Sequence, residues 1–161
     1  DMSKLSDLAE EIAAILKERG ETVAVVETSG GGLISAALLA VPGASAYYVG
    51  GAVTYTGTAR DAFLGIDLEG HPGVRSSSEP YASLIAATVR TKLDTTWGIS
   101  ETGASGPTGN GYGDLAGHTC VAVSGPTDRV MTLETGLSDR ETNMTLFAER
   151  CLEQFVETLN A

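Results

Sequence analysis

The segment 23–39, VAVVETSGGGLISAALL, places an apolar β-type run, a glycine-rich turn and an apolar helix in immediate succession. A strand and a helix of this kind both need apolar partners, which favours a sheet covered by helices. The polar residues Glu27, Thr28 and Ser29 come directly at the turn. Backbone amides between a strand and a helix start can bind an anion or an oxyanion. The segment therefore predicts an α/β fold with a ligand site at this turn.

Capping residues and the spacing of apolar residues mark the other elements. Ser3 or Ser6 is expected to cap a first helix that stops at residue 20. Ser78 is expected to cap a later helix, and Asp139 to start the last one. The expected strands are 22–26, 46–56, 97–102, 118–125 and 129–136, and the further helices are 33–39, 58–66, 79–93 and 140–159.

Single strands that alternate with helices and end in a hairpin predict a three-layer α/β/α domain with a mixed sheet. The 161 residues are expected to form this single domain. Asp1 is expected to be an addition in front of the native start, Met2. A chain of this length buries about two thirds of its unfolded surface.

The charge of the chain argues against nucleic acid as a partner. The formal net charge is −11, and the ten basic residues are scattered and form no stripe that could neutralise phosphates. No apolar run approaches the roughly 18 to 20 residues of a membrane span, and the start of the chain does not resemble a signal peptide. We therefore expect a cytoplasmic protein without a membrane partner.

Cysteine and histidine usage predicts neither a disulfide framework nor a metal site. Cys120 and Cys151 are the only cysteines and are expected to be reduced thiols. His71 and His118 are the only histidines, and neither has the spacing of a metal ligand. Both are expected to be structural or surface residues, and no metal or other cofactor is expected.

A second glycine cluster, 102–117, follows the strand 97–102 with the sequence TGASGPTGNGYGDLAG. Ligands in open α/β sheets gather at the carboxyl ends of the strands, so both glycine clusters are expected to line one cleft. Glycines also serve simply to form turns, and this interpretation stays open for each cluster.

In their order along the chain, these segments resemble the competence/damage-inducible protein CinA C-terminal domain family. The resemblance rests on VETSGGGLISAALL, SSSEPYA and TGASGPTGNGYGDLAGHTCVAV, and extends from about residue 5 to residue 155. It implies the activity of a nicotinamide mononucleotide deamidase, an amidohydrolase of pyridine-nucleotide salvage. It also implies a homo-oligomer, for which the apolar segment 45–55 is a candidate sheet edge. The molybdopterin-binding-like N-terminal domain of some relatives is not expected within these 161 residues.

The resemblance implies catalytic roles for Thr28, Ser29, Tyr55 and Arg60. The nucleophilic serine of the family corresponds to Thr28, the following cysteine to Ser29, and the lysine thought to activate the serine to Arg60. An arginine cannot act as that base, because its pKa stays above ~12 and it has no acceptor atom. It can instead bind a phosphate or stabilise an alkoxide. If burial removes them from water, Glu27 and Glu101 are alternative bases.

The same resemblance implies a binding site for a nucleotide monophosphate at both glycine clusters. Its expected residues are Glu27, Gly30, Gly31, Gly32, Thr102, Gly103, Gly106, Gly109 and Arg140. Three functions stay open. One is hydrolysis of nicotinamide mononucleotide to nicotinate mononucleotide and ammonia, with Thr28 as nucleophile. The second is a weak or inactive relative that binds a nucleotide-like small anion, and the third is a hydrolase of another amide.

Several candidate residues also have a purely structural interpretation. Thr28 could cap the following helix, Tyr55 could belong to the core of the sheet, and Arg60 could be a solvated helix residue. The pair Asp139-Arg140 is equally explained by capping and by the helix dipole. These alternatives differ in the burial and contacts that they require.

Overall fold

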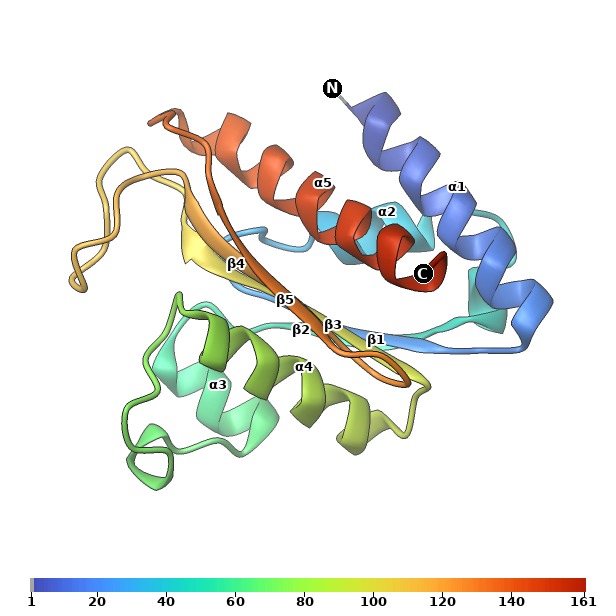
Figure 1. The fold of residues 1–161 in the computed structure, drawn as a ribbon, viewed down its shortest axis with the longest axis horizontal. Coiled ribbons are helices and arrows are strands. Elements are labelled where there is room, and N and C mark those ends of the chain that lie inside the picture. The colour runs from blue at the N-terminus through green and yellow to red at the C-terminus, as the bar shows by residue number, and fades with distance from the viewer. Residues whose placement is uncertain (1) are drawn as a thin grey trace.

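The computed structural model describes the backbone of residues 2–161 and the side chains of residues 4–161. A mixed sheet of five strands lies between two layers of helices, as the sequence predicts (Figure 1). The elements are α1 (Met2–Arg19), β1 (Val23–Glu27), α2 (Leu33–Leu39), η1 (Ala44–Ala46), β2 (Tyr48–Val53), α3 (Gly57–Leu64), η2 (Leu68–Gly70), α4 (Glu79–Leu93), β3 (Trp97–Ala104), β4 (His118–Ser124), β5 (Arg129–Glu134) and α5 (Arg140–Leu159).

The strand order β2-β1-β3-β4-β5 brings the ends of three parallel strands together. β1 pairs in parallel with β2 and β3, whereas β4 runs antiparallel to both of its neighbours, β3 and β5. In this register Glu27, the last residue of β1, pairs with Val53 on one side and Glu101 on the other. The turns that follow β1, β2 and β3 therefore meet at one edge of the sheet.

The two helical layers cover opposite faces of the sheet. Figure 1 shows α1, α2 and α5 on one face and α3 and α4 on the other. Every residue of β1 is buried, which explains why its first four residues are all apolar rather than alternating with polar ones. In the larger core, Trp97 packs edge-on against Phe155 with 5.7 Å between the ring centroids. The smaller core lies under α4 and includes Val26 and Ile85.

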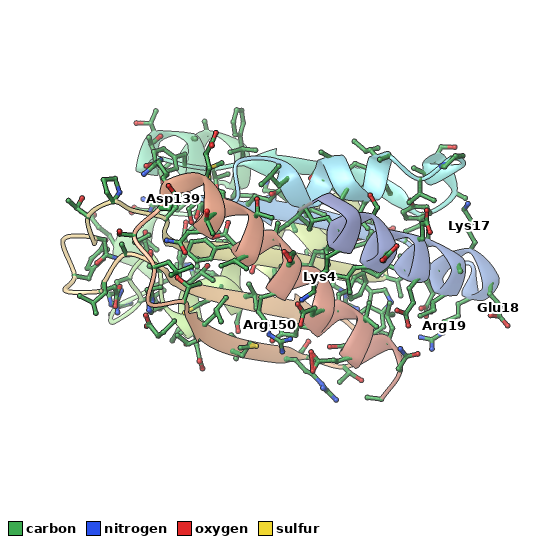
Figure 2. The ribbon with its side chains drawn as sticks, turned by 90° about the horizontal axis from the view of Figure 1, so that it is seen from above. Lys4, Lys17, Glu18, Arg19, Asp139 and Arg150 are labelled. Carbon is green, nitrogen blue, oxygen red and sulfur yellow. The ribbon has the colours of Figure 1, made fainter. Side chains whose placement is uncertain are left out.

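An ion pair links α1 to α5 on the outer surface of the first layer (Figure 2). The Lys4 ammonium lies 2.9 Å from the Glu153 carboxylate, and within α5 Arg150 pairs with both Glu153 and Glu157. Pairs of this exposure contribute little to stability. No helix in the described part of the chain combines the length and apolar composition needed to cross a membrane.

The helix caps agree with the sequence except at the first helix. The hydroxyl of Ser78 accepts the Tyr81 N–H, and the Asp139 carboxylate accepts the Thr142 N–H, as expected. α1 begins at Met2, so the expectation that Ser6 caps it is wrong: Ser6 lies inside the helix. The side chain of Ser3 and the structure of Asp1 lie outside the described residues.

β2 forms one edge of the sheet, as the oligomer hypothesis requires. Its residues Val49 and Val53 are exposed, and the register slips by one residue near its start. A Cβ at Gly51 would lie 2.9 Å from the Val25 carbonyl oxygen, so this position requires glycine. Assembly through this edge stays a prediction.

Candidate active site

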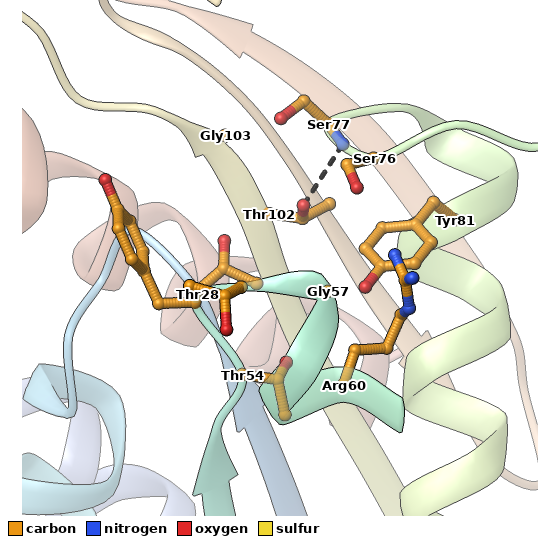
Figure 3. A pocket seen from close by; sticks show the side chains of 11 residues that line it. Thr28, Thr54, Gly57, Arg60, Ser76, Ser77, Tyr81, Thr102 and Gly103 are labelled. Carbon is orange, nitrogen blue, oxygen red and sulfur yellow. Dashed lines mark hydrogen bonds between the residues drawn. The ribbon is translucent and has the colours of Figure 1, made fainter. Parts of the chain in front are cut away.

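The turns after β1, β2 and β3 enclose a small cavity of about 80 Å³ (Figure 3). Eight of its eleven lining residues carry a hydroxyl group, and Arg60 is the one charged side chain among the eleven. The lining consists of Thr28, Thr54, Tyr55, Thr56, Gly57, Arg60, Ser76, Ser77, Tyr81, Thr102 and Gly103. We refer to it as the hydroxyl cavity.

Two wider cavities adjoin the hydroxyl cavity and share Tyr55 with it. The first, of about 290 Å³, is lined by Ser29, Tyr55, Gly103, Ala104, Ser105, Gly106, Thr108, Gly109, Asn110 and Arg140. The second, of about 230 Å³, is lined by Thr28, Ser29, Gly31, Val53, Tyr55, Arg140 and Met144. We call the 290 Å³ space the glycine-loop cavity. Residues of both glycine clusters thus line one cleft, as expected from the strand ends.

The carboxylate of Glu27 organises the start of α2. Its oxygens accept the N–H groups of Gly32 at 3.1 Å and of Ile34 and Ser35 at 2.9 Å each. Burial raises the pKa of Glu27, and these hydrogen bonds act in the opposite direction. Glu27 therefore satisfies the free amides of the helix, and Thr28 does not cap it as the structural interpretation proposed.

A second buried carboxylate, Glu101 on β3, holds the turn from the other side. Its Oε1 accepts the N–H of Thr28 at 3.2 Å and of Gly30 at 2.6 Å. Its Oε2 accepts the hydroxyls of Ser29 at 2.7 Å and Thr119 at 2.9 Å. Burial raises the pKa of Glu101, and the hydrogen bond from Ser29 opposes this most strongly.

The backbone amides of Gly30 and Gly32 are hydrogen-bonded to carboxylates of the protein, whereas the sequence led us to expect that they bind a ligand. They donate to Glu101 and Glu27, and of the three turn glycines only Gly31 lines one of the three cavities. A Cβ at Gly30 would lie 3.0 Å from Oε1 of both glutamates. The turn needs glycine so that two carboxylates can approach its backbone. Glu27 likewise lies behind the cleft rather than in its lining.

Thr28 and Ser29 present their hydroxyls differently. The Ser29 hydroxyl is held by Glu101, whereas Thr28 contributes its backbone N–H to Glu101 and its side chain to the hydroxyl cavity. If Glu101 acts as a base, the hydroxyl that it would deprotonate is therefore that of Ser29. In this turn Glu101 accepts the hydroxyl of Ser29 but only the backbone N–H of Thr28.

Arg60 is held against α4 rather than solvated. Its side chain is 14% exposed, and its Nε donates to the Asp61 carboxylate at 3.0 Å. Figure 3 shows the guanidinium beside the Tyr81 ring at the wall of the cavity. Burial raises the pKa of Tyr81, which the neighbouring Arg60 charge opposes. Tyr81 lay inside an expected helix, and its sequence context gave no sign of a place in the site.

Arg140 joins the second glycine cluster to the end of β2. Its Nη1 donates to the Gly106 carbonyl at 2.5 Å, and its Nη2 to the Tyr55 hydroxyl at 3.1 Å. Tyr55 is 61% exposed, so it does not belong to the core. Both residues line the glycine-loop cavity. Arg140 is therefore a cleft residue as well as the first residue of a capped helix.

His118 lies between Asp114 of the second glycine cluster and Ser77, which lines the hydroxyl cavity. Its Nε2 lies 2.7 Å from the Ser77 carbonyl and its Nδ1 2.5 Å from the Glu134 carboxylate. Ser77, whose N–H donates to the Thr102 hydroxyl, has a φ of 58°. Asp114, itself paired with Arg75, lies 3.6 Å from Nε2. His118 is the structural histidine that the sequence predicts, but its partners could not be read from sequence.

Comparison with known proteins agrees with this architecture. The family model of the CinA C-terminal domain matches residues 5–159 of the sequence. The chain belongs to this family. CinA-like proteins of Nostoc sp. and Salinibacter ruber are 33% identical over 127 residues and 36% identical over 145 residues. These matches cover 79% and 90% of this chain but only 30% and 35% of the relatives.

A solved structure extends the match over the whole fold. The crystal structure of competence/damage inducible protein CihA from Agrobacterium tumefaciens superposes with a TM-score of 0.90. It is 25% identical, and the match covers 99% of this chain and 97% of that one. The sheet order and both helical layers are therefore those of the CinA superfamily.

Substituting Gly30 tests the role of the two glutamates. We expect Gly30→Ala to destabilise the fold by about 1–3 kcal/mol, because the new methyl crowds two carboxylates that several donors hold in place. The melting temperature should fall by about 2–12 °C. Gly70→Ala is the matched control, since a Cβ there meets nothing within 4 Å. Equal melting temperatures for both variants would contradict this account.

The contacts of His118 predict a pH dependence of stability. Burial lowers the pKa of His118, but the hydrogen bonds to Glu134 and Ser77 and the Asp114 and Glu134 charges outweigh it and raise the pKa. This stabilisation is complete below the unfolded-state pKa of about 6.5 and is lost as pH rises through the higher folded-state value. The difference in unfolding free energy between wild type and His118→Gln should shrink from pH 5.5 to pH 9. His71→Gln is the control; a constant difference for His118→Gln would refute the prediction.

Proposed function

We propose that this chain binds nicotinamide mononucleotide in the cleft and hydrolyses its carboxamide slowly, with Thr28 as the nucleophile. The products would be nicotinate mononucleotide and ammonia. Membership in the CinA C-terminal domain family supports the proposal, together with the resemblance of the turn to a deamidase site. The observation that carries it is the position of Thr28, whose side chain lines the same small cavity as Arg60 and Thr102.

The cleft divides into parts that suit the parts of this substrate. The hydroxyl cavity has room for a compact group such as a carboxamide, and the glycine-loop cavity is more than three times larger. Arg140 and the backbone of Gly103 and Gly106 line that larger space. A guanidinium and glycine-loop amides are suitable donors for a phosphate. We therefore place the carboxamide beside Thr28 and the phosphate beside Arg140.

The lining of the hydroxyl cavity supports stabilisation of charge better than proton transfer. Arg60 and neighbouring hydroxyls can donate to the oxyanion that forms when Thr28 attacks the amide carbon. None of the eleven lining residues is a carboxylate, histidine or lysine, and Arg60 cannot accept the Thr28 proton. A missing general base lowers the rate by about 10² to 10⁴. Turnover should therefore be slow.

The same lining favours a second candidate, a protein that binds the nucleotide without hydrolysing it. Hydroxyls and one guanidinium line the cavity, whereas catalysis also requires a base, and no lining side chain is a carboxylate, histidine or lysine. The two functions share the ligand and differ only in product formation.

Thr28→Val tests the assignment of the nucleophile. Ammonia and nicotinate mononucleotide released from nicotinamide mononucleotide should fall to background, because valine keeps the shape of threonine but has no hydroxyl. Thr28→Ser should retain or raise the rate, since it removes the methyl that restricts the side chain. Loss of turnover in Ser29→Ala but not in Thr28→Val would instead assign the reaction to the Ser29–Glu101 pair. No turnover in wild type would leave the binding function, which thermal shift with the nucleotide would test.

Arg60→Lys tests whether the missing base limits the reaction. Unlike arginine, a lysine at this position can lose its proton and then accept one from Thr28. We expect kcat to rise by about tenfold or more, towards the 10² to 10⁴ that a general base supplies. Arg129→Lys, on the exposed side of β5, is the matched control. An unchanged or lower kcat in Arg60→Lys would show that proton transfer to residue 60 does not limit turnover.

A further inference from the structure

A buried hydroxyl without a partner faces the hydroxyl cavity. Thr54, the residue after β2, is 2% exposed, and among the described residues its Oγ1 is the one buried side-chain polar atom without a hydrogen-bond partner. Figure 3 shows its side chain at the cavity, below Thr28. Buried polar groups are nearly always hydrogen-bonded, because leaving them unpaired is destabilising. An acceptor atom inside the cavity would satisfy this hydroxyl.

The charged groups around Thr54 indicate whether the acceptor atom of a ligand there would be neutral or negatively charged. The chain contains 21 acidic residues, yet none of them lines this cavity. Arg60 is the charged side chain in the lining, and Asp61 holds its Nε, which leaves the terminal nitrogens at the cavity wall. Gly57, in the first turn of α3, lies in the lining as well, so the positive end of that helix dipole points the same way. All of these features favour a negatively charged group.

The pattern of donors distinguishes a carboxylate from a carboxamide. A carboxylate offers acceptors on both oxygens, whereas a carboxamide offers one acceptor oxygen and an NH₂ group that can only donate. Arg60 also only donates, and the fork of its guanidinium matches the two oxygens of a carboxylate. The Thr102 hydroxyl already accepts the Ser77 N–H, so its own proton remains to be donated. A carboxamide would therefore match only one arm of the Arg60 fork, and its NH₂ group would have to donate to a hydroxyl oxygen instead.

We infer that the hydroxyl cavity is a carboxylate subsite, in which Arg60 and Thr54 bind an acid more tightly than the corresponding amide. This inference rests on the proposed function in one respect: hydrolysis at Thr28 would leave the new carboxylate in this cavity. The acid product would then stay bound, and its release would slow turnover further. Binding of the acid itself requires no hydrolysis and can be measured independently.

The test compares two ligands that differ only in this group. Calorimetry would measure the dissociation constants of nicotinate mononucleotide and nicotinamide mononucleotide for the Thr28→Val variant, in which turnover is blocked. We expect the acid to bind about tenfold or more tightly than the amide, as expected for charge-assisted hydrogen bonds. Adding Arg60→Met should bring the ratio close to one, and Arg129→Met should leave it unchanged. The phosphate is common to both ligands, so its contribution cancels in the ratio.

Other results would overturn the inference. Equal affinities for acid and amide would show that the cavity does not select a carboxylate. If Arg60→Met weakened both ligands equally and inorganic phosphate competed with both, the cavity would bind the phosphate instead. A wild-type protein without turnover that still preferred the acid would disprove the proposed hydrolysis and retain the subsite.

Thr54→Val gives a second measurement that does not depend on Arg60. The variant should weaken acid binding severalfold but leave the melting temperature of the free protein unchanged or higher, because no hydrogen bond is lost. Thr95→Val is the matched control: the Thr95 hydroxyl is also buried but donates to the Trp97 carbonyl at 2.9 Å. Its loss should lower the melting temperature and leave the affinity ratio intact. A Thr54→Val protein with unchanged acid binding would contradict the role of Thr54.

Discussion

The cleft depends on two buried carboxylates at the ends of neighbouring strands. Glu27 and Glu101 pair in the register of β1 and β3, and their burial raises both pKa values. Like charges this close repel, so the arrangement requires many donors on each carboxylate. The turn that follows β1 supplies most of them, from its backbone and from Ser29. The glutamates therefore fix the turn, and the turn directs Thr28 into the hydroxyl cavity.

This arrangement changes what binds the ligand. A glycine turn before a helix usually offers its amides to an anion. Here two of those amides bind carboxylates of the protein itself, so under the proposed function recognition would fall to side chains from other segments. Arg60 comes from α3, Thr54 from the end of β2 and Arg140 from α5. The ligand site is consequently assembled only when the whole sheet edge has formed.

The sequence predicts the elements well because their signals are local. The apolar run 23–26 of β1, the Ser78 cap and the hairpin of β4 and β5 follow from short patterns, and so does the meeting of both glycine clusters at the strand ends. The role of the turn amides could not be predicted in this way. The same glycine pattern precedes a helix whether its amides meet a phosphate or a glutamate from a distant strand. The unpaired Thr54 hydroxyl and the contact of His118 with Ser77 likewise arise from tertiary packing alone.

The two changes from the family pattern that the resemblance implies would act in the same direction on the proposed reaction. Threonine in place of serine keeps the hydroxyl but restricts its approach, and arginine in place of lysine removes the proton acceptor while adding a carboxylate binder. Under the proposed function, the first would slow formation of the acid, and the second would slow both its formation and its release. A lining of hydroxyl donors around one guanidinium matches the charge of the product better than that of the neutral amide. Such a cavity holds an acid more effectively than it produces one, so retention of the ligand is the property that its chemistry favours.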